Sequence, residues 1–239
     1  MTQHTTTGAA LAFLDDKVFY ADMIDLVQRD AADILQAGPD GVLLRTGTGT
    51  CLLASANEAT ARRLLTLVDD CRLLVAHSPF ELPLAEAMFG LNRRTTCLSS
   101  AYVGPALAPV SHSDLRIEPL TLAWQPVVSA NYAMDGPDYH RSRIEAGQMW
   151  GAFRGDDLTG FIGLHEEGAM GLLVVLEPYR RQGIARYLLT HLTNDVLSRG
   201  LTPYDHIIVG NAASAALQAG LGFTISSRTL AWISRSESD

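Results

Sequence analysis

The sequence is short of cysteine, of long apolar runs and of positive charge, and each shortage excludes a class of protein. Its three cysteines, Cys51, Cys71 and Cys97, form no CxxC pair, so we expect neither a disulfide framework nor a zinc site. No uninterrupted apolar run reaches the roughly 18 residues that a membrane helix needs. The start also lacks the basic segment of a secretory signal. These absences predict a reduced, cytoplasmic protein with no membrane partner.

Charge and motif content narrow the function further. The net charge is −8, and both halves are acidic, which is not the basic excess that nucleic-acid binders carry. The seven histidines show no pair at metal-binding spacing, so we expect no metal cofactor. The chain also has no Walker loop, and the stretch GTGTC at 47–51 lacks the third glycine and the following helix of a dinucleotide-binding turn.

A segment rich in proline and small polar residues, 103–114, divides the chain nearly in half. We expect an N-terminal α/β domain of unknown role over 1–110 and a second domain over 115–239. In the first half, apolar spacing and turn residues predict helices and strands in alternation. The helices are expected at 15–37, 57–68 and 81–90, and the strands at 42–45, 51–55, 72–77 and 95–102, with a turn at 38–41.

The second half predicts a sheet with flanking helices. Strands are expected at 115–120, 149–154, 158–165, 168–177, 204–210 and 223–233. Helices are expected at 121–132, at 137–147, from the arginine-rich turn to 198, and at 211–222.

The stretch PYRRQGIARYLL, 178–189, joins an apolar strand to a helix through a sharp turn. The first amides of a helix have no acceptor within the helix, and the helix dipole makes that end positive. Gly183 lets a ligand approach the main chain, while Arg180 and Arg181 add full positive charges. This combination predicts a site for a phosphate or diphosphate.

The stretch RRQGIA fits the coenzyme signature of the GNAT acyltransferase superfamily, in which a glutamine or arginine is followed three places later by glycine. Downstream, NAASAALQAGLGF at 211–223 matches a second segment of that superfamily. The chain over 115–235 therefore resembles a GNAT domain, most of all in two-domain glycine N-acyltransferase-type members and related bacterial proteins. The resemblance implies an α/β (α+β) fold with a central mixed, mostly antiparallel sheet, preceded here by a smaller α/β domain.

The resemblance also assigns the coenzyme contacts. It places the diphosphate of acetyl-CoA, or of another acyl-CoA, on Arg180, Arg181, Gln182, Gly183, Ile184 and Ala185. The pantetheine arm would follow the backbone of Leu173, Val174 and Val175, with Asn211 and Ser214 beside it.

The usual catalytic side chains are missing at the matching positions. Ala169 stands where a general-base glutamate is often found, and Gln218 where a general-acid tyrosine is usual. We expect Glu167 or Glu166, acting through an ordered water, or His165 to replace the base, with His206 as a further candidate. Tyr179 and Tyr187 are expected to pack beside the loop, and strands 149–154 and 158–165 to form a wall of the acceptor pocket. Trp150 and Phe153 should point to opposite faces of their strand.

The resulting hypothesis is an acyl-CoA-dependent N-acetyltransferase. It would transfer the acetyl group to the primary amine of a small molecule or amino acid by direct attack on the thioester. The protein would act as a monomer or homodimer without metal or nucleic acid. Two alternatives stay open: a catalytically impaired acyl-CoA sensor or regulatory module, and a structural scaffold with a partner-binding first half.

Overall fold

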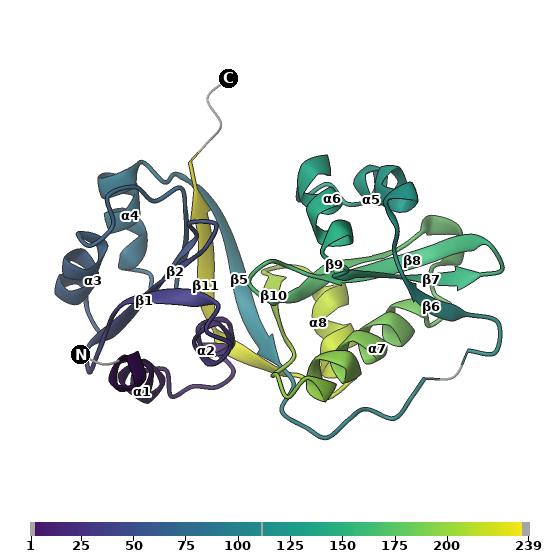
Figure 1. Cartoon of the computed structure of the whole chain (residues 1–239), viewed down its shortest axis with the longest axis horizontal. Helices are drawn as coiled ribbons and strands as arrows, with labels where there is room; N and C mark the ends of the chain where they lie inside the picture. Colours follow the sequence, from purple (N-terminus) through teal and green to yellow (C-terminus); the bar gives the residue numbers. More distant parts are fainter. Residues whose placement is uncertain (1–2, 111, 236–239) are drawn as a thin grey trace. The chain divides into compact units, whose positions relative to one another are not determined.

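The chain forms two compact units in this computed structural model, which describes residues 3–110 and 112–235 (Figure 1). Unit 1 consists of Met1–Ala101, His206–Ala212 and Ile225–Asp239, and unit 2 of Tyr102–Asp205 and Ala213–Thr224. The chain therefore returns twice to unit 1 after leaving it. The predicted division into 1–110 and 115–239 differs from these units, because it places 206–212 and 225–239 in the second domain.

Unit 1 is built on a seven-stranded sheet in the order β1-β2-β3-β4-β11-β5-β10. The strands β1, β2 and β3 pair antiparallel, whereas β3 and β4 pair parallel. The elements are α1 (Gln3–Phe13), α2 (Ala21–Gln28), β1 (Ala32–Gly38), β2 (Gly41–Thr46), β3 (Cys51–Ser55), α3 (Glu58–Leu65), β4 (Leu73–Ala76), α4 (Glu81–Phe89), β5 (Arg93–Ala101), β10 (Tyr204–Ile208) and β11 (Thr224–Ser234).

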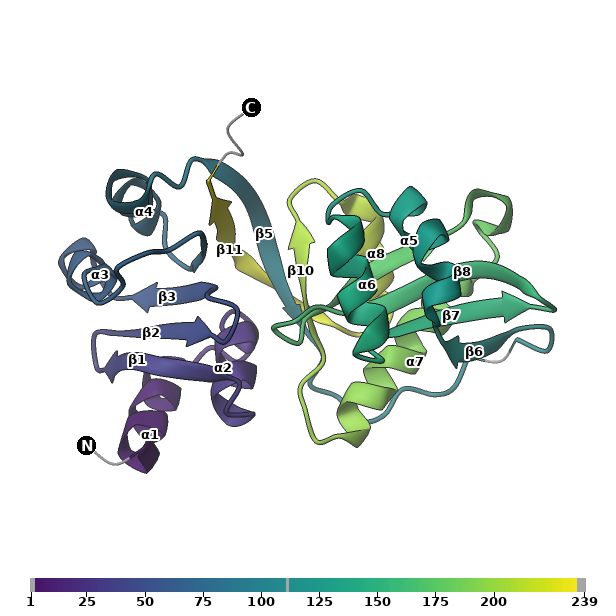
Figure 2. The same cartoon turned by 45° about the horizontal axis from the view of Figure 1, so that its top comes forward.

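Unit 2 contains a four-stranded antiparallel sheet in the order β6-β7-β8-β9. Its strands are β6 (Arg116–Pro119), β7 (Met149–Arg154), β8 (Asp157–Leu164) and β9 (Met170–Val175). Its helices are α5 (Gln125–Asn131), α6 (Pro137–Glu145), α7 (Ile184–Ser198) and α8 (Ala212–Ala219), with 3-10 turns η1 (Leu122–Trp124) and η2 (Glu177–Tyr179). The pair α5–α6 covers one face of this sheet and α7 the other (Figures 1 and 2). The whole is a mixed α/β fold with mostly antiparallel sheets and flanking helices, as predicted.

The same order of elements occurs in both halves of the chain. The segment from α1 to β5 consists of two helices and three antiparallel strands, followed by helix, strand, helix and strand. The segment from α5 to β11 has the same order. The sequence showed no repeat, although the order of elements is the same in both halves.

One predicted helix is wrong. The segment 15–37 contains α2, which ends at Gln28, and then the strand β1 from Ala32. The positive φ of Asp30, 54°, turns the chain between them. Ile34 pairs with Leu44 of β2, so sheet pairing overrides the helical spacing there. The helix α1 was not predicted.

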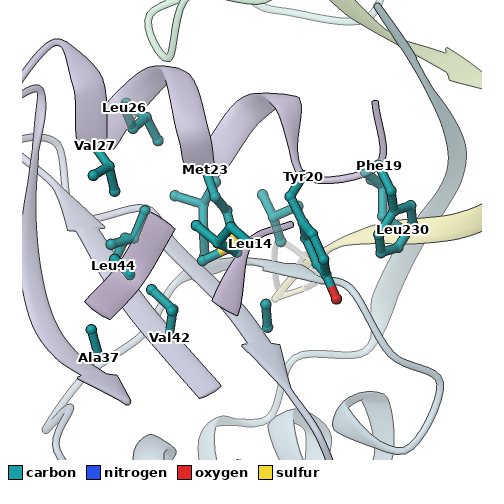
Figure 3. Packing of buried hydrophobic residues seen from close by; sticks show 14 of the residues in the cluster. Leu14, Phe19, Tyr20, Met23, Leu26, Val27, Ala37, Val42, Leu44 and Leu230 are labelled. Carbon is teal, nitrogen blue, oxygen red and sulfur yellow. The ribbon is translucent and has the colours of Figure 1, made fainter. Parts of the chain in front are cut away.

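One core cluster of unit 1 lies between α1, α2 and the sheet (Figure 3). Phe19 and Met23 of this cluster are fully buried, and Phe19 lies beside Leu230 of β11 (Figure 3). At the usual 25 cal/mol per Å2 of apolar surface, burying each of these side chains contributes about 1.5–3 kcal/mol to folding.

A charged cluster is buried beside this core. His77 Nε2 lies 3.1 Å from both carboxylate oxygens of Asp22, and its Nδ1 lies 2.9 Å from the Leu53 carbonyl. Both ring nitrogens therefore face acceptors. Burial alone would lower the pKa of His77, but the charge and hydrogen bond of Asp22 raise it overall. His77 is therefore held as the cation beside the Asp22 carboxylate.

His206 completes the cluster as a neutral ring. Its Nδ1 accepts a hydrogen bond from Trp232 Nε1 at 3.0 Å, and its Nε2 lies 3.6 Å from Asp22 Oδ2. Burial, together with the nearby charge of His77, lowers the pKa of His206 to about 4 despite the attraction of Asp22.

This low pKa predicts an acid-sensitive unit 1. The neutral ring contributes stability above its ordinary pKa of 6.5, and this stability is lost as the pH falls to about 4, because only the unfolded chain takes up the proton. Between these pH values, wild type should lose about 3 kcal/mol more unfolding free energy than His206→Gln. Urea unfolding at both pH values measures the difference, and parallel losses in the two proteins would contradict the burial of a neutral His206.

Candidate active site

The predicted coenzyme loop lies between β9 and α7, within unit 2. Arg181 and Gly183 both adopt left-handed backbone conformations, with φ of 64° and 81°. The first backbone bond of the helix joins the Tyr187 amide to the Gly183 carbonyl at 3.0 Å. The amides of residues 184–186 therefore have no acceptor within α7 and are available to a bound anion. The six predicted loop residues thus belong to one turn.

Cationic side chains surround this loop. Arg180 is anchored, because its Nε donates to the Val175 carbonyl at 3.2 Å. Arg154 of β7, which the sequence did not single out, donates from both terminal nitrogens to Gln182 Oε1 at 3.1 Å. Gln182 is therefore held by the protein itself. A Cβ added to Gly183 would lie 3.2 Å from His112 Nε2, so this histidine also lies beside the turn.

The strand that leads into the loop is bulged and lies at a sheet edge. Gly163 pairs with Gly171 and Phe161 with Val174, so Leu172 and Leu173 oppose one residue of β8. Leu172 adopts a φ of 54°, which costs a non-glycine residue about 1–3 kcal/mol. Because β9 is the last strand of its sheet, its outer edge offers backbone N–H and C=O groups to a ligand. The predicted pantetheine contacts Leu173 and Val174 lie here.

A tyrosine contacts the bulge. The Leu172 backbone donates a hydrogen bond to the hydroxyl of Tyr132, which follows α5. Burial raises the pKa of Tyr132, and the negative charges of Asp135, Asp205 and Glu167 raise it further. The phenol is therefore protonated at neutral pH and lies in a negative field.

A second tyrosine binds the predicted catalytic turn. The Tyr139 hydroxyl lies 2.8 Å from His165 Nδ1 and accepts from the Glu166 amide at 3.3 Å. Burial raises the pKa of Tyr139, and the charge of Glu167 acts in the same direction. His165 packs over Gly171, where an added Cβ would lie 2.4 Å from its Nε2. The site thus brings His165 and Glu167 near two phenols, whereas Glu166 contributes its backbone.

Two residues stand where the resemblance places a general base and a general acid, and both are buried. Ala169 is 2% exposed and Gln218 is 1% exposed. The Gln218 amide donates to Asp205 and, at 3.2 Å, to Ser214 Oγ. The Gln218 side chain therefore holds the Asp205 carboxylate in place.

Other predicted residues lie elsewhere. His206 and Asn211 belong to unit 1, and His206 is part of the cluster with Asp22. Trp150 packs toward α7 and Phe153 toward α5, which confirms opposite faces. Phe161 is fully buried with Phe153, so these rings fill cores and do not line an open wall. Tyr179 and Tyr187 pack as predicted, against Arg154 and His112.

The sequence did not reveal Tyr132, Tyr139, Asp135 or Asp205 as site residues. Three of them lie in NYAMDGPDYH, 131–140, which spans the end of α5, the connection and the start of α6, where no spacing rule marks them. Their positions follow from the packing of α5 and α6 on the sheet.

Comparison with known proteins agrees with this geometry. Residues 116–223 match the model of the acetyltransferase (GNAT) family. An X-ray structure of a Drosophila protein resembles the chain with a TM-score of 0.69 at 15% identity, covering 99% of this chain and 97% of that one. A GNAT-family acetyltransferase from Colwellia psychrerythraea gives 0.52 at 18% identity, covering 82% and 81%. A GCN5-related N-acetyltransferase from Kribbella flavida gives 0.56 at 14% identity, covering 92% and 95%.

At these identities the structural likeness shows the fold alone. The curated proteins compared with this sequence include no match. Over residues 3–110 and 112–235, no helix is long and apolar enough to cross a membrane. The same residues hold no group of three or more His, Cys, Asp or Glu side chains that could bind a metal ion. The family match covers residues 116–223, just under half of the chain, and shows that this segment is similar to the GNAT acetyltransferases.

Proposed function

We propose that the chain transfers an acetyl group from acetyl-CoA to the primary amine of a small molecule or amino acid. The observation that carries this proposal is the arrangement in unit 2, where a helix start with free amides follows a bulged edge strand after one short connection. The first feature suits a diphosphate, and the second suits an amide-containing arm that pairs with backbone. The finer resemblance to glycine N-acyltransferase-type members remains a prediction.

The loop and β9 would hold the coenzyme. The free amides at the start of α7 would bind the diphosphate, with Arg181 supplying positive charge beside them; Arg154 already pairs with Asp114 at 2.7 Å. The arm would pair with Leu173 and Val174, because Arg180 already occupies the Val175 carbonyl. Ser214, which belongs to the same unit, is a proposed contact along the arm.

The reaction needs a neutral amine, donors for the developing oxyanion and a proton for the leaving sulfur. We assign removal of the amine proton to Glu167, acting through an ordered water, with the His165–Tyr139 pair beside it. A backbone amide at the bulge would donate to the thioester oxygen as negative charge develops there. Tyr132 would donate a proton to the leaving thiolate. This help is modest, because an ordinary thiol has a pKa near 8.5.

The charges of the site suit a cationic acceptor. Asp135, Glu167 and Asp205 all act on Tyr132 electrostatically, so their carboxylates share one region of unit 2. Burial raises the pKa of Asp135, and the charge of His140 offsets this only in part. A protonated amine would supply a further cation on binding.

Coenzyme release, followed with a thiol reagent over a panel of amines and amino acids, tests this function. Turnover with at least one amine is expected, together with thermal stabilisation by acetyl-CoA. Stabilisation without turnover would identify the sensor alternative instead, and the absence of both would reject the coenzyme site.

Gly183→Ala should weaken acetyl-CoA binding about tenfold or more. The added Cβ would lie 3.2 Å from His112 Nε2, and the alanine would have to adopt the positive φ of Gly183. Both effects would shift the amides of the turn. Gly147→Ala is the matched control, since Gly147 has a φ of 65° and no atom within 4 Å of an added Cβ. Calorimetric titration should show weaker binding in the first variant alone; equal affinities would remove the loop from the coenzyme site.

Tyr132→Phe should lower kcat about 10- to 100-fold and leave acetyl-CoA affinity unchanged, because only the proton donor is lost. Tyr102→Phe is the control, as its hydroxyl binds the Pro105 carbonyl within the same unit. Steady-state kinetics with both substrates separates the two parameters. A Tyr132→Phe enzyme with normal kcat would show that the leaving sulfur needs no phenol.

Glu167→Gln should lower kcat about 100-fold at neutral pH, because the amide cannot accept the proton. Glu166→Gln provides a neighbouring control, since Glu166 is exposed and contributes its backbone. Raising the pH should partly restore Glu167→Gln, as more of the amine is already neutral. An equal loss of kcat in the two variants would show that Glu167 is not the general base.

A further inference from the structure

Unit 1 contains a pocket of about 810 Å3 that none of the functions above uses. Its apolar wall comes from α1 and the segments that follow β1 and β4, with Phe13, Tyr20 and Phe80 as its rings. Its polar groups are Ser55, Ser78 and Arg228, with Asp15 beside them. All of these residues belong to unit 1.

The position of the pocket follows from the repeated order of elements. The strand β3 and the helix α3 correspond to β9 and α7 of the second half. The parallel pair β3–β4 extends from Cys51↔Leu74 to Leu53↔Ala76, and the pocket lies just beyond it, at Ser55 and Ser78. Ends of parallel strands are frequent ligand sites in α/β folds.

This pocket is not a second diphosphate site. The side chain of Asn57 accepts the Thr60 amide at 2.9 Å, so the protein itself caps the start of α3. The residue after the cap is Glu58, which would repel a diphosphate. The start of α3 thus has one of its first amides capped, an acidic first residue and no adjacent arginine pair before it.

Arg228 brings an unbalanced positive charge to the pocket. Its guanidinium lies 3.7 Å from the centroid of the buried Phe19 ring and 5.3 Å from that of Tyr20. It also donates to the Tyr20 hydroxyl at 3.3 Å. Within 3–110 and 112–235, no carboxylate forms an ion pair with it. The rings of Phe19 and Tyr20 therefore fix the position of an exposed guanidinium that has no carboxylate partner among the described residues.

The polar side of the pocket is held rigidly. Glu81 accepts hydrogen bonds from the Ser55 hydroxyl and from the amides of His77 and Ser78, at 2.8 and 2.9 Å for the amides. Ser55 thus donates its proton inward, which leaves its oxygen as an acceptor at the pocket. The His77–Asp22 pair fixes His77 behind it.

We propose that unit 1 binds a small monocarboxylic acid with an aromatic or aliphatic body in this pocket. The carboxylate pairs with Arg228, and the body packs against Phe13, Tyr20 and Phe80. The Ser55 oxygen accepts a hydrogen bond from a hydroxyl or amide N–H on the body. Asp15 disfavours a second carboxylate.

The test is ligand-observed NMR on the full chain with benzoate, hexanoate, the dicarboxylate adipate and the neutral benzamide. Benzoate or hexanoate should bind, and adipate and benzamide should bind at least tenfold more weakly. Arg228→Gln should weaken monocarboxylate binding at least tenfold. Arg62→Gln, which alters an exposed arginine of α3 paired with Glu58, should leave binding unchanged.

Arg228→Lys keeps the charge and should retain more binding than Arg228→Gln, which separates lost charge from lost folding. Thermal stabilisation by acetyl-CoA reports on unit 2 and should be the same in all variants. A failure of monocarboxylate binding would therefore not bear on the proposed transferase function. The proposal is overturned if no monocarboxylate binds, if benzamide or adipate binds as well as the monocarboxylates, or if binding survives in Arg228→Gln.

Discussion

The backbone amides at the start of α7 are the constraint on which the rest of the second unit depends. A helix cannot satisfy its own first amides, and here two left-handed residues, Arg181 and Gly183, turn the chain just before them. The bulge of β9 sets the edge strand that leads into this turn, and α7 packs across the same sheet. A helix start with free amides and a strand edge therefore follow one another in the chain.

The two units share one order of elements but differ in how the first amides of the corresponding helices are satisfied. In unit 1, Asn57 caps the helix after β3, and the carboxylate of Glu81 takes the amides after β4. In unit 2, the amides at the start of the corresponding helix, α7, have no acceptor within the helix, and Arg180 and Arg181 precede them. Burial raises the pKa of Glu81 to about 7, which shows how unfavourable it is to bury this carboxyl group in its charged form. Side chains of unit 1 thus accept hydrogen bonds from these backbone amides, whereas the first amides of α7 in unit 2 have no acceptor within their helix.

The sequence predicted what depends on local patterns. The strand–turn–helix at 170–198 could be predicted because Gly183, the arginines and the apolar spacing act within a few residues. The strand at Ala32–Gly38 was missed because its partner, β2, decides its structure. Tyr132 and Tyr139 were missed because only the packing of α5 and α6 brings them to β9 and to the turn at His165. Asp22 lies on a helix that looked merely amphipathic, and its partner His77 is 55 residues away.

A crystal structure of the full chain with acetyl-CoA tests the central claim most directly. The account predicts the diphosphate on the amides at the start of α7, the pantetheine arm along Leu173 and Val174, and the thioester within reach of the Tyr132 hydroxyl. A diphosphate bound at any other place, or an arm that leaves the edge of β9 unpaired, would contradict it.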